Sequence, residues 1–214
     1  MEKKTPFKEL SSKQKFVYIW DYYRIPIAII LVIIITVAYY LHGALNPKNK
    51  VLGVLCINSI REDNVNDSGL YDDFLIENGF DPSKDAIMHN GNISVNISNP
   101  LSYQQTAVLD AYFTDNQYDI CFADPETFEY YTDNCAFVPI SNYLDEETLK
   151  KYEDDLVYAT DTETNIEYPC GITIDKNSSE WLEESGLYDE CTVGVCFNES
   201  NPSLITNFLN TVLD

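Results

Sequence analysis

The chain has 214 residues, of which 13 are Lys or Arg and 35 are Asp or Glu, so its formal net charge at pH 7 is −22. This charge excludes nucleic acid, anionic lipid headgroups and polyanionic polymers as direct ligands, because like charges repel one another across a Debye length. Cations, neutral solutes and basic protein partners remain compatible with it.

The first feature in chain order is the uncharged apolar run Ile25–Leu41. As a helix, at about 1.5 Å per residue, it would span roughly 26 Å, close to the hydrocarbon thickness of a bilayer. Aromatic residues flank both ends of the run, as at a membrane interface, and Pro26 would stand at the helix start. We therefore predict a transmembrane signal anchor over residues 25–42. A cleaved signal peptide is the alternative, but no small-x-small cleavage site follows Leu41.

The distribution of charge predicts the orientation of this anchor. Residues 1–24 carry a net charge of +3, and the rest of the chain carries −25. The positive-inside rule then puts the basic tip in the cytoplasm and everything beyond the anchor outside. We expect a single-pass protein of the cell membrane, with a linker over residues 43–50 and an extracellular domain over residues 51–214.

Short apolar runs, which indicate buried strands, alternate with segments that have the pattern of amphipathic helices along the predicted domain. Strands are predicted at 51–58, 86–97, 118–123, 168–174 and 192–197. Helices are predicted to begin near Ser68, Leu101, Asp124, Asp145 and Asn201, while Tyr158–Asn165 is predicted to be a polar loop. This order is typical of the α/β class, in which helices cover both faces of a parallel sheet.

Six cysteines, all in the predicted domain, raise the question of disulfides: Cys56, Cys121, Cys135, Cys170, Cys191 and Cys196. Several lie inside apolar runs, where cysteine behaves as a small buried hydrophobic residue. Free buried thiols are therefore favoured over a disulfide framework. With no CxxC pair and only two histidines in the chain, a zinc site has no basis either.

Four segments, in their order along the chain, resemble extracellular solute-binding proteins of type 2 ABC importers. They are Tyr118–Asp124 with the Pro-Glu-Thr-Phe that follows, Phe137–Leu144, Tyr168–Ile172 and Phe197–Pro202. The likeness spans about Val51 to Asp214 and implies the fold of a type 2 periplasmic binding protein. Too few residues separate Leu144 from Gly171 for the second lobe of such a protein, so the resemblance implies a single lobe. It supports the fold better than it supports transport.

The candidate ligand-binding residues follow from the rule that open α/β sheets bind ligands beyond the carboxyl ends of their strands. That rule selects five residues after the first and third strands: Asn58, Ser59, Asp124, Glu126 and Thr127. Tyr168, together with Tyr103, could provide a stacking face for a sugar. The alternative is that Asp124 only caps a helix, that Asn58 and Ser59 only form a turn, and that the tyrosines only pack.

Metal binding and catalysis have weaker support. Asp63–Gly69 resembles half of a calcium loop, but Leu75 stands where a bidentate Glu should close it, so a solvated turn is favoured. Asp161–Asn165 is equally ambiguous, and no metal site is assigned.

GxSxG, HExxH and P-loop motifs do not occur, and His89 has no acid or nucleophile beside it in its strand. We therefore expect no enzymatic activity and no cofactor.

Two functions fit these features. The first is a membrane-anchored extracellular binding module for a neutral solute, such as a saccharide or a peptide. The second is a non-enzymatic interaction or scaffold domain that docks on a membrane or envelope partner protein without a small ligand. Neither involves nucleic acid.

Overall fold

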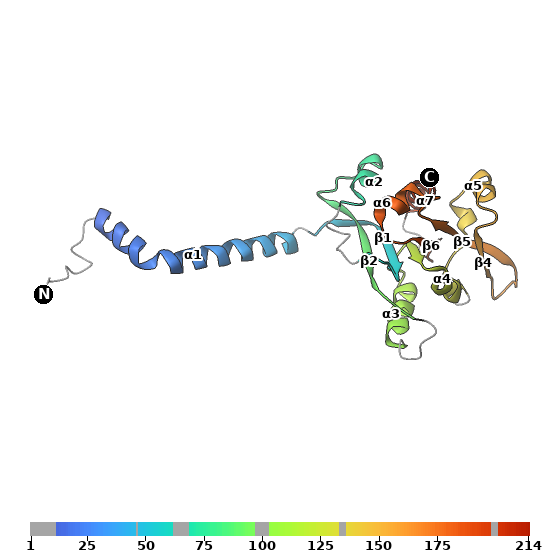
Figure 1. The fold of residues 1–214 in the computed structure, drawn as a ribbon, viewed down its shortest axis with the longest axis horizontal. Coiled ribbons are helices and arrows are strands. Elements are labelled where there is room, and N and C mark those ends of the chain that lie inside the picture. The colour runs from blue at the N-terminus through green and yellow to red at the C-terminus, as the bar shows by residue number, and fades with distance from the viewer. Residues whose placement is uncertain (1–11, 46, 62–68, 97–102, 133–135, 198–200) are drawn as a thin grey trace. The chain divides into compact units, whose positions relative to one another are not determined.

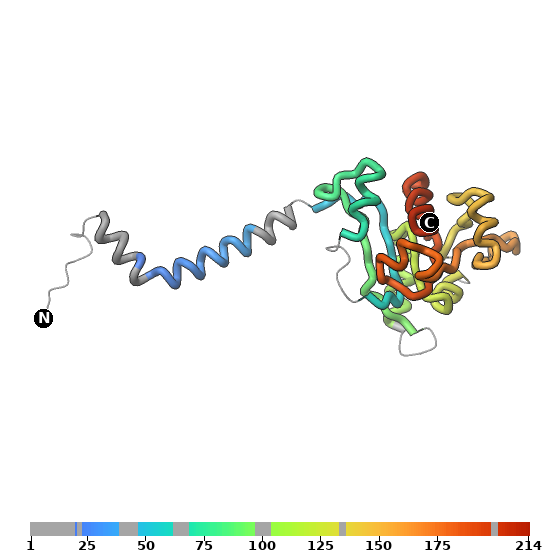
Figure 2. Tube along the Cα trace, turned by 45° about the horizontal axis from the view of Figure 1, so that its top comes forward, coloured from blue at the N-terminus to red at the C-terminus, as the bar shows by residue number. Residues whose placement is uncertain are grey.

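The computed structural model describes residues 12–45, 47–61, 69–96, 103–132, 136–197 and 201–214, which form two compact units, Met1–Pro47 and Lys48–Asp214. In the first unit, helix α1 (Ser12–Leu45) contains the predicted anchor. Pro26 lies inside this helix rather than at its start, and the helical trace continues beyond it (Figure 2). In the part of the chain that is described, no helix has the length and apolar character needed to cross a bilayer. The span at 25–42 therefore stays a prediction from the sequence.

The second unit is built on one six-stranded sheet. Its strands are β1 (Asn49–Ile57), β2 (Asp85–Ile93), β3 (Ile120–Ala123), β4 (Leu156–Thr160), β5 (Glu167–Asp175) and β6 (Glu190–Val195), in the spatial order β2-β1-β3-β6-β5-β4. Strand β1 pairs in parallel with β2 and β3, whereas β3–β6, β6–β5 and β5–β4 are antiparallel pairs. The prediction of a parallel sheet is therefore wrong for three of the five strand pairs, and the sheet is mixed.

Helices cover both faces of this sheet (Figure 1). One face carries α2 (Asp72–Glu77), α5 (Glu146–Lys151), α6 (Glu180–Ser185) and α7 (Pro202–Leu213). The other carries α3 (Tyr103–Thr114) and α4 (Pro125–Thr132), and a short 3₁₀ helix, η4, spans Ile140–Asn142. The predicted α/β class is confirmed, with three layers.

Each face of the sheet has its own apolar core, because side chains alternate along a strand. In β1, Val54 and Cys56 face the layer of α7, whereas Leu55 and Ile57 face the layer of α3 and α4. On the α7 side, the rings of Phe122 and Trp181 are stacked, with centroids 5.4 Å apart. The strand at Tyr118–Ala123 was predicted from its continuous apolar run, and its core residues are fully buried on both faces.

Two glycines form the floor on which α4 packs. A Cβ atom at Gly194 would lie 2.5 Å from the Phe128 ring, and one at Gly171 would lie 2.7 Å from it. The Phe128 ring in turn stacks on Phe137 at a centroid distance of 4.1 Å. Only residues without a side chain let this aromatic pair approach the sheet so closely.

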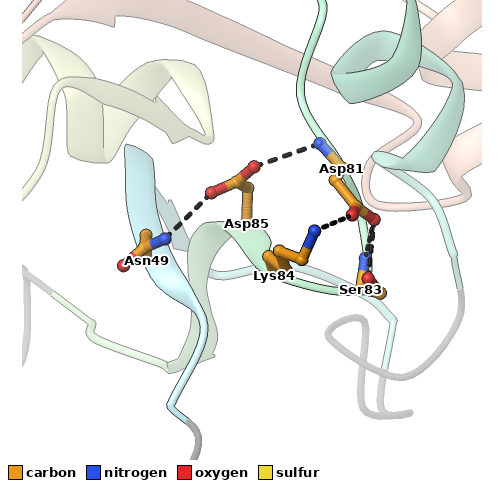
Figure 3. Close-up of polar contacts among 5 residues, drawn as sticks. All are labelled: Asn49, Asp81, Ser83, Lys84 and Asp85. Atoms are coloured by element: carbon orange, nitrogen blue, oxygen red, sulfur yellow. Dashed lines mark hydrogen bonds and ion pairs between the residues drawn. The ribbon is translucent and has the colours of Figure 1, made fainter.

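Polar contacts join the starts of β1 and β2 (Figure 3). Asn49 Nδ2 donates to Asp85 Oδ1 at 3.1 Å, and the Asp81 backbone N–H donates to Asp85 Oδ2 at 3.0 Å. Asp81 Oδ1 accepts from Ser83, and Lys84 Nζ lies 3.0 Å from Asp81 Oδ2. These hydrogen bonds and the Lys84 ammonium lower the pKa of Asp81 to about 2. The contacts fix the turn that brings the chain into β2.

The predicted loop at Tyr158–Asn165 is wrong over its first residues. Tyr158–Thr160 belongs to β4, and only the following turn is irregular. Strand β4 lies at the edge of the sheet and buries little, with Ala159 its one buried residue. An edge strand of this kind lacks the apolar run by which the other strands were recognised.

The five cysteines in the described part of the chain are free and buried, as predicted, while Cys135 lies outside it. Burial raises the pKa of the Cys56 thiol, and the neighbouring Cys191 adds to the effect. The pKa of Cys121 is also raised, first by burial and then by Cys196. Cys56 and Cys121 are therefore protonated members of the core rather than nucleophiles.

Candidate functional site

The structure brings three of the predicted site residues together at the carboxyl ends of β1 and β3. Asn58 Nδ2 donates to Asp124 Oδ2 at 2.6 Å and lies 3.1 Å from Thr127 Oγ1. The Asn58 Oδ1 accepts from the Val95 N–H at 2.7 Å. This cluster joins the ends of three strands, as the rule for open sheets led us to expect.

The polar atoms of this cluster are used within the protein. Asp124 Oδ1 accepts the N–H of Thr127 at 3.1 Å, which is the geometry of a helix N-cap on α4. Asn58 has φ 60°, a left-handed conformation that asparagine tolerates, and it turns the chain out of β1. Thr127 is 2% exposed. Asp124 and Thr127 therefore stabilise the start of α4, and Asn58 forms the turn after β1. This agrees with the alternative given above, in which Asp124 caps a helix and Asn58 belongs to a turn.

Ser59 forms its hydrogen bonds with a different part of the chain. Ser59 Oγ donates to the Leu187 carbonyl at 3.1 Å and accepts from the Arg61 N–H at 3.3 Å. Arg61 Nη1 donates to the Ser185 carbonyl at 2.7 Å, which ties this loop to α6. Glu126 is exposed in the first turn of α4.

Tyr168 lies near the opposite end of the strands from Asp124. Strand β5 runs in the same direction as β3, because each is antiparallel to β6, and Tyr168 stands near the start of β5. Its hydroxyl donates to the Phe137 carbonyl at 3.1 Å. The structure therefore does not bring Tyr168 together with Asn58, and the side chain of Tyr103 lies outside the described residues.

Of the two possible calcium loops, Asp63–Ser68 lies outside the described residues. In the other, Asp161 Oδ1 accepts the N–H groups of Glu163 and Thr164 at 2.9 and 2.8 Å. These hydrogen bonds lower the pKa of Asp161. The carboxylate thus closes a local turn, which is the alternative that the sequence favoured.

A surface hollow of about 520 Å³ lies at the edge where β3 begins and β6 ends. It is lined by Asp110, Phe113, Thr114, Asn116, Tyr130, Tyr131, Ala136 and Phe197. This volume falls within the roughly 300–1,000 Å³ of small-molecule sites. Four of the lining side chains are aromatic, and Phe197 is 65% exposed.

The aromatic rings of the hollow are arranged as a corner. Tyr130 and Tyr131 have ring centroids 5.1 Å apart and planes at 86° to each other. The ring of Phe113 lies 5.0 Å from that of Tyr131, at an angle of 44°. Tyr131 is only 1% exposed, so most of the aromatic surface that a ligand in the hollow can touch comes from Tyr130, at 44%, and Phe197, at 65%.

The hydroxyl of Tyr131 is the unusual polar group here. It is buried and has no hydrogen-bond partner among the residues that the structure describes. Buried hydroxyl groups normally have a partner, because losing hydration without one is costly. Burial raises the pKa of Tyr131, and the nearby Asp110 carboxylate raises it further, so the group stays a neutral donor.

Asn116 connects the two sides of the hollow. In the amide orientation that satisfies both of its neighbours, Nδ2 donates to the Phe113 carbonyl at 3.1 Å and to the Phe197 carbonyl at 2.5 Å. Asn116 has φ 50°, so it also turns the chain between α3 and β3. It thereby holds the exposed Phe197 beside α3.

Comparison with protein-family models, with curated proteins and with solved structures found no match to this chain. The class that the fold and the site define is therefore a mixed α/β domain with an aromatic surface hollow, and its function has to be argued from that hollow.

Proposed function

We propose that the protein is a non-enzymatic extracellular binding module, similar to one lobe of a solute-binding protein and anchored in the cell membrane by residues 25–42. The aromatic hollow is its ligand site. The observation that carries this proposal is a hollow of ligand size that exposes the rings of Tyr130 and Phe197 and is lined in part by the buried Tyr131, whose hydroxyl lacks a partner in the described structure. A bound solute with a hydrogen-bond acceptor would satisfy it.

The remaining support comes from the sequence. The uncharged run Ile25–Leu41 and the charge difference across it favour a span with the acidic domain outside. The polar groups of Asn58, Asp124 and Thr127 are bonded to one another, so a site at that edge is less well supported than the hollow.

A thermal-shift screen of the full chain against saccharides, short peptides and small amines tests the binding function. At a ligand concentration of about 100 Kd, binding adds about 2.7 kcal/mol to the free energy of unfolding. A ligand that raises Tm for the wild type, but not for Tyr130→Leu, would support the hollow as the site. The matched control is Tyr158→Leu, which removes a similarly exposed ring on β4. No shift with any compound would overturn the proposal.

The second candidate is an interaction domain that docks on a membrane or envelope partner. It is favoured by one observation: the described residues beyond Pro47 form a single compact unit. A single lobe cannot close around a solute as two lobes do. A photo-crosslinking residue at position 130 should capture a partner protein in intact cells if this candidate holds, whereas one at position 158 should not.

A further inference from the structure

The charge of the hollow narrows the class of ligand. Among the described lining residues Asp110 is the one carboxylate, and none is Lys, Arg or His. The chain as a whole carries −22. Within this field an anion is repelled and a cation is attracted, while a neutral solute gains nothing from it.

The aromatic corner favours the same class. The face of an aromatic ring is negative and attracts a cation within about 6 Å of its centroid. Tyr130 and Tyr131 stand perpendicular at 5.1 Å, with Phe113 beside Tyr131. Several rings around one point are the arrangement that binds alkylated ammonium groups, because these cations shed water easily and contact ring faces with their methyl groups.

The hydroxyl of Tyr131 adds a second requirement. A neutral phenol that lacks a partner in the described structure can donate one hydrogen bond. A methylated ammonium group has no acceptor atom, so the ligand must carry an oxygen elsewhere. Cation and oxygen acceptor together describe an amino alcohol or a related small ammonium compound.

We infer that the hollow between α3, α4 and Phe197 binds a small organic ammonium compound that carries a hydroxyl or carbonyl oxygen. Asp110 and the exposed rings of Tyr130 and Phe197 contact the ammonium group. The Tyr131 hydroxyl is buried in the structure, and it donates to the ligand oxygen once a side chain that covers it moves aside. This inference rests on the proposed function, since it names the ligand class of the same hollow. It replaces the neutral solute expected from the sequence with a cation.

Calorimetric titration of the full chain tests this inference. The chain is held in a nonionic polyoxyethylene detergent, which contains neither an ammonium group nor a sugar. The probes are choline, tetramethylammonium and 3,3-dimethyl-1-butanol, the uncharged carbon isostere of choline. Choline is expected to bind most tightly, tetramethylammonium more weakly because it lacks the oxygen, and the isostere at least tenfold more weakly than choline because it lacks the charge.

Three variants assign the contacts. Tyr130→Leu should raise the Kd for choline about two- to thirtyfold, the range expected for a cation that loses a ring face. Asp110→Asn should raise it about two- to fivefold, as expected for the loss of an exposed carboxylate. Tyr131→Phe should abolish the preference for choline over tetramethylammonium. Tyr158→Leu and Asp73→Asn are the matched controls, since they remove an exposed ring and an exposed carboxylate from other elements, and both should leave the Kd unchanged.

The outcomes separate the inference from the function on which it rests. Equal affinity for choline and its isostere, or a saccharide that binds in the hollow while choline does not, overturns the cation and leaves the binding function standing. Absence of binding by every amine, saccharide and peptide overturns both. Binding of choline that none of the three variants weakens places the cation outside the hollow and also overturns the inference.

Discussion

At the scale of single residues, Tyr131 and Tyr188 are both buried tyrosines whose hydroxyl groups differ in environment. The hydroxyl of Tyr131 has no partner in the described structure, whereas that of Tyr188 donates to the Ile57 carbonyl at 2.7 Å. Removing a buried hydroxyl that makes no hydrogen bond eliminates the free-energy cost of having taken that group out of water. Removing a hydroxyl that donates a hydrogen bond leaves its acceptor without a donor.

The prediction is that Tyr131→Phe leaves the free energy of unfolding unchanged or raises it by about 1 kcal/mol, while Tyr188→Phe lowers it by about 1–2 kcal/mol. Urea denaturation of both variants without ligand measures the difference. A loss at Tyr131 as large as that at Tyr188 would show that its hydroxyl has a partner after all, and would remove the main support for the hollow as a site.

His89 gives the protein a dependence on pH. It is 7% exposed, and its Nδ1 lies 2.6 Å from the Tyr71 hydroxyl. Burial, and next the charge of Arg61, lower its pKa from 6.5 to about 4. Between these two values the unfolded chain binds a proton that the folded protein does not, so stability falls as the pH falls.

We therefore predict that the free energy of unfolding decreases by about 3 kcal/mol between pH 6.5 and pH 4. His89→Gln should flatten this part of the profile when unfolding is followed by circular dichroism. Below about pH 4 the further loss should be the same in both proteins, because there the carboxylates with lowered pKa, such as Asp81 and Asp161, take up protons. An unchanged slope in His89→Gln would assign the effect to other groups.

At the scale of elements, the packing of α4 on the sheet depends on Gly171 and Gly194. The three atoms nearest to a Cβ at Gly171 would be side-chain atoms of Phe128 and Thr192, whereas a Cβ at Gly194 would also lie 2.8 Å from the Cys170 carbonyl oxygen. Side chains can move aside more easily than backbone in a sheet.

Gly171→Ala and Gly194→Ala should each lower the free energy of unfolding by about 1–3 kcal/mol, the usual cost of overpacking a core. A second substitution, Phe128→Leu, should recover part of the loss for Gly171→Ala but little for Gly194→Ala. Double-mutant cycles in urea measure these two couplings. Equal coupling energies of Phe128 with both glycines would contradict the argument that the Cys170 carbonyl oxygen, and not only the Phe128 ring, obstructs a Cβ at Gly194.

The elements also show which parts of the fold can be read from the sequence. Strand β3 was predicted because its apolar run is continuous and buried on both faces, and α7 because Asn201 and Pro202 mark its start. Strand β4 was missed because an edge strand with one buried residue has no such pattern. The antiparallel half of the sheet could not be predicted, because pairing direction follows from long-range contacts that periodicity does not record.

The candidate site was harder to predict than the fold. The rule for open sheets selected Asn58, Asp124 and Thr127, which do lie together in the structure. It could not show that their polar groups are already hydrogen-bonded to one another. The hollow joins residues from Asp110 to Phe197, which lie far apart in the sequence and meet only because β3 and β6 pair. Adjacent tyrosines at 130 and 131 were the one local signal, and within a helix such a pair is ordinarily read as packing.

At the scale of the whole molecule, the two units divide the sequence at the point where its charge changes. Unit Met1–Pro47 contains the uncharged run, and unit Lys48–Asp214 contains both cores and nearly all of the acidic residues. If the first unit spans the membrane, the acidic unit must lie wholly on one side of it, and the positive-inside rule selects the outside.

The protein should therefore stay in the membrane pellet after alkaline carbonate extraction, and a protease added to intact cells or spheroplasts should remove the epitope of a C-terminal tag while sparing an N-terminal one. Replacing Ile33 and Val37 by Lys should release the protein from the pellet, because each charge near the centre of a span costs about 2.5–3.5 kcal/mol. The matched control, Ile76→Lys together with Ile166→Lys, places the same charges at exposed positions of the acidic unit and should leave the protein in the pellet. Release of the wild-type protein by carbonate, or protection of the C-terminal tag from the protease, would contradict the anchor and its orientation without bearing on the ligand of the hollow.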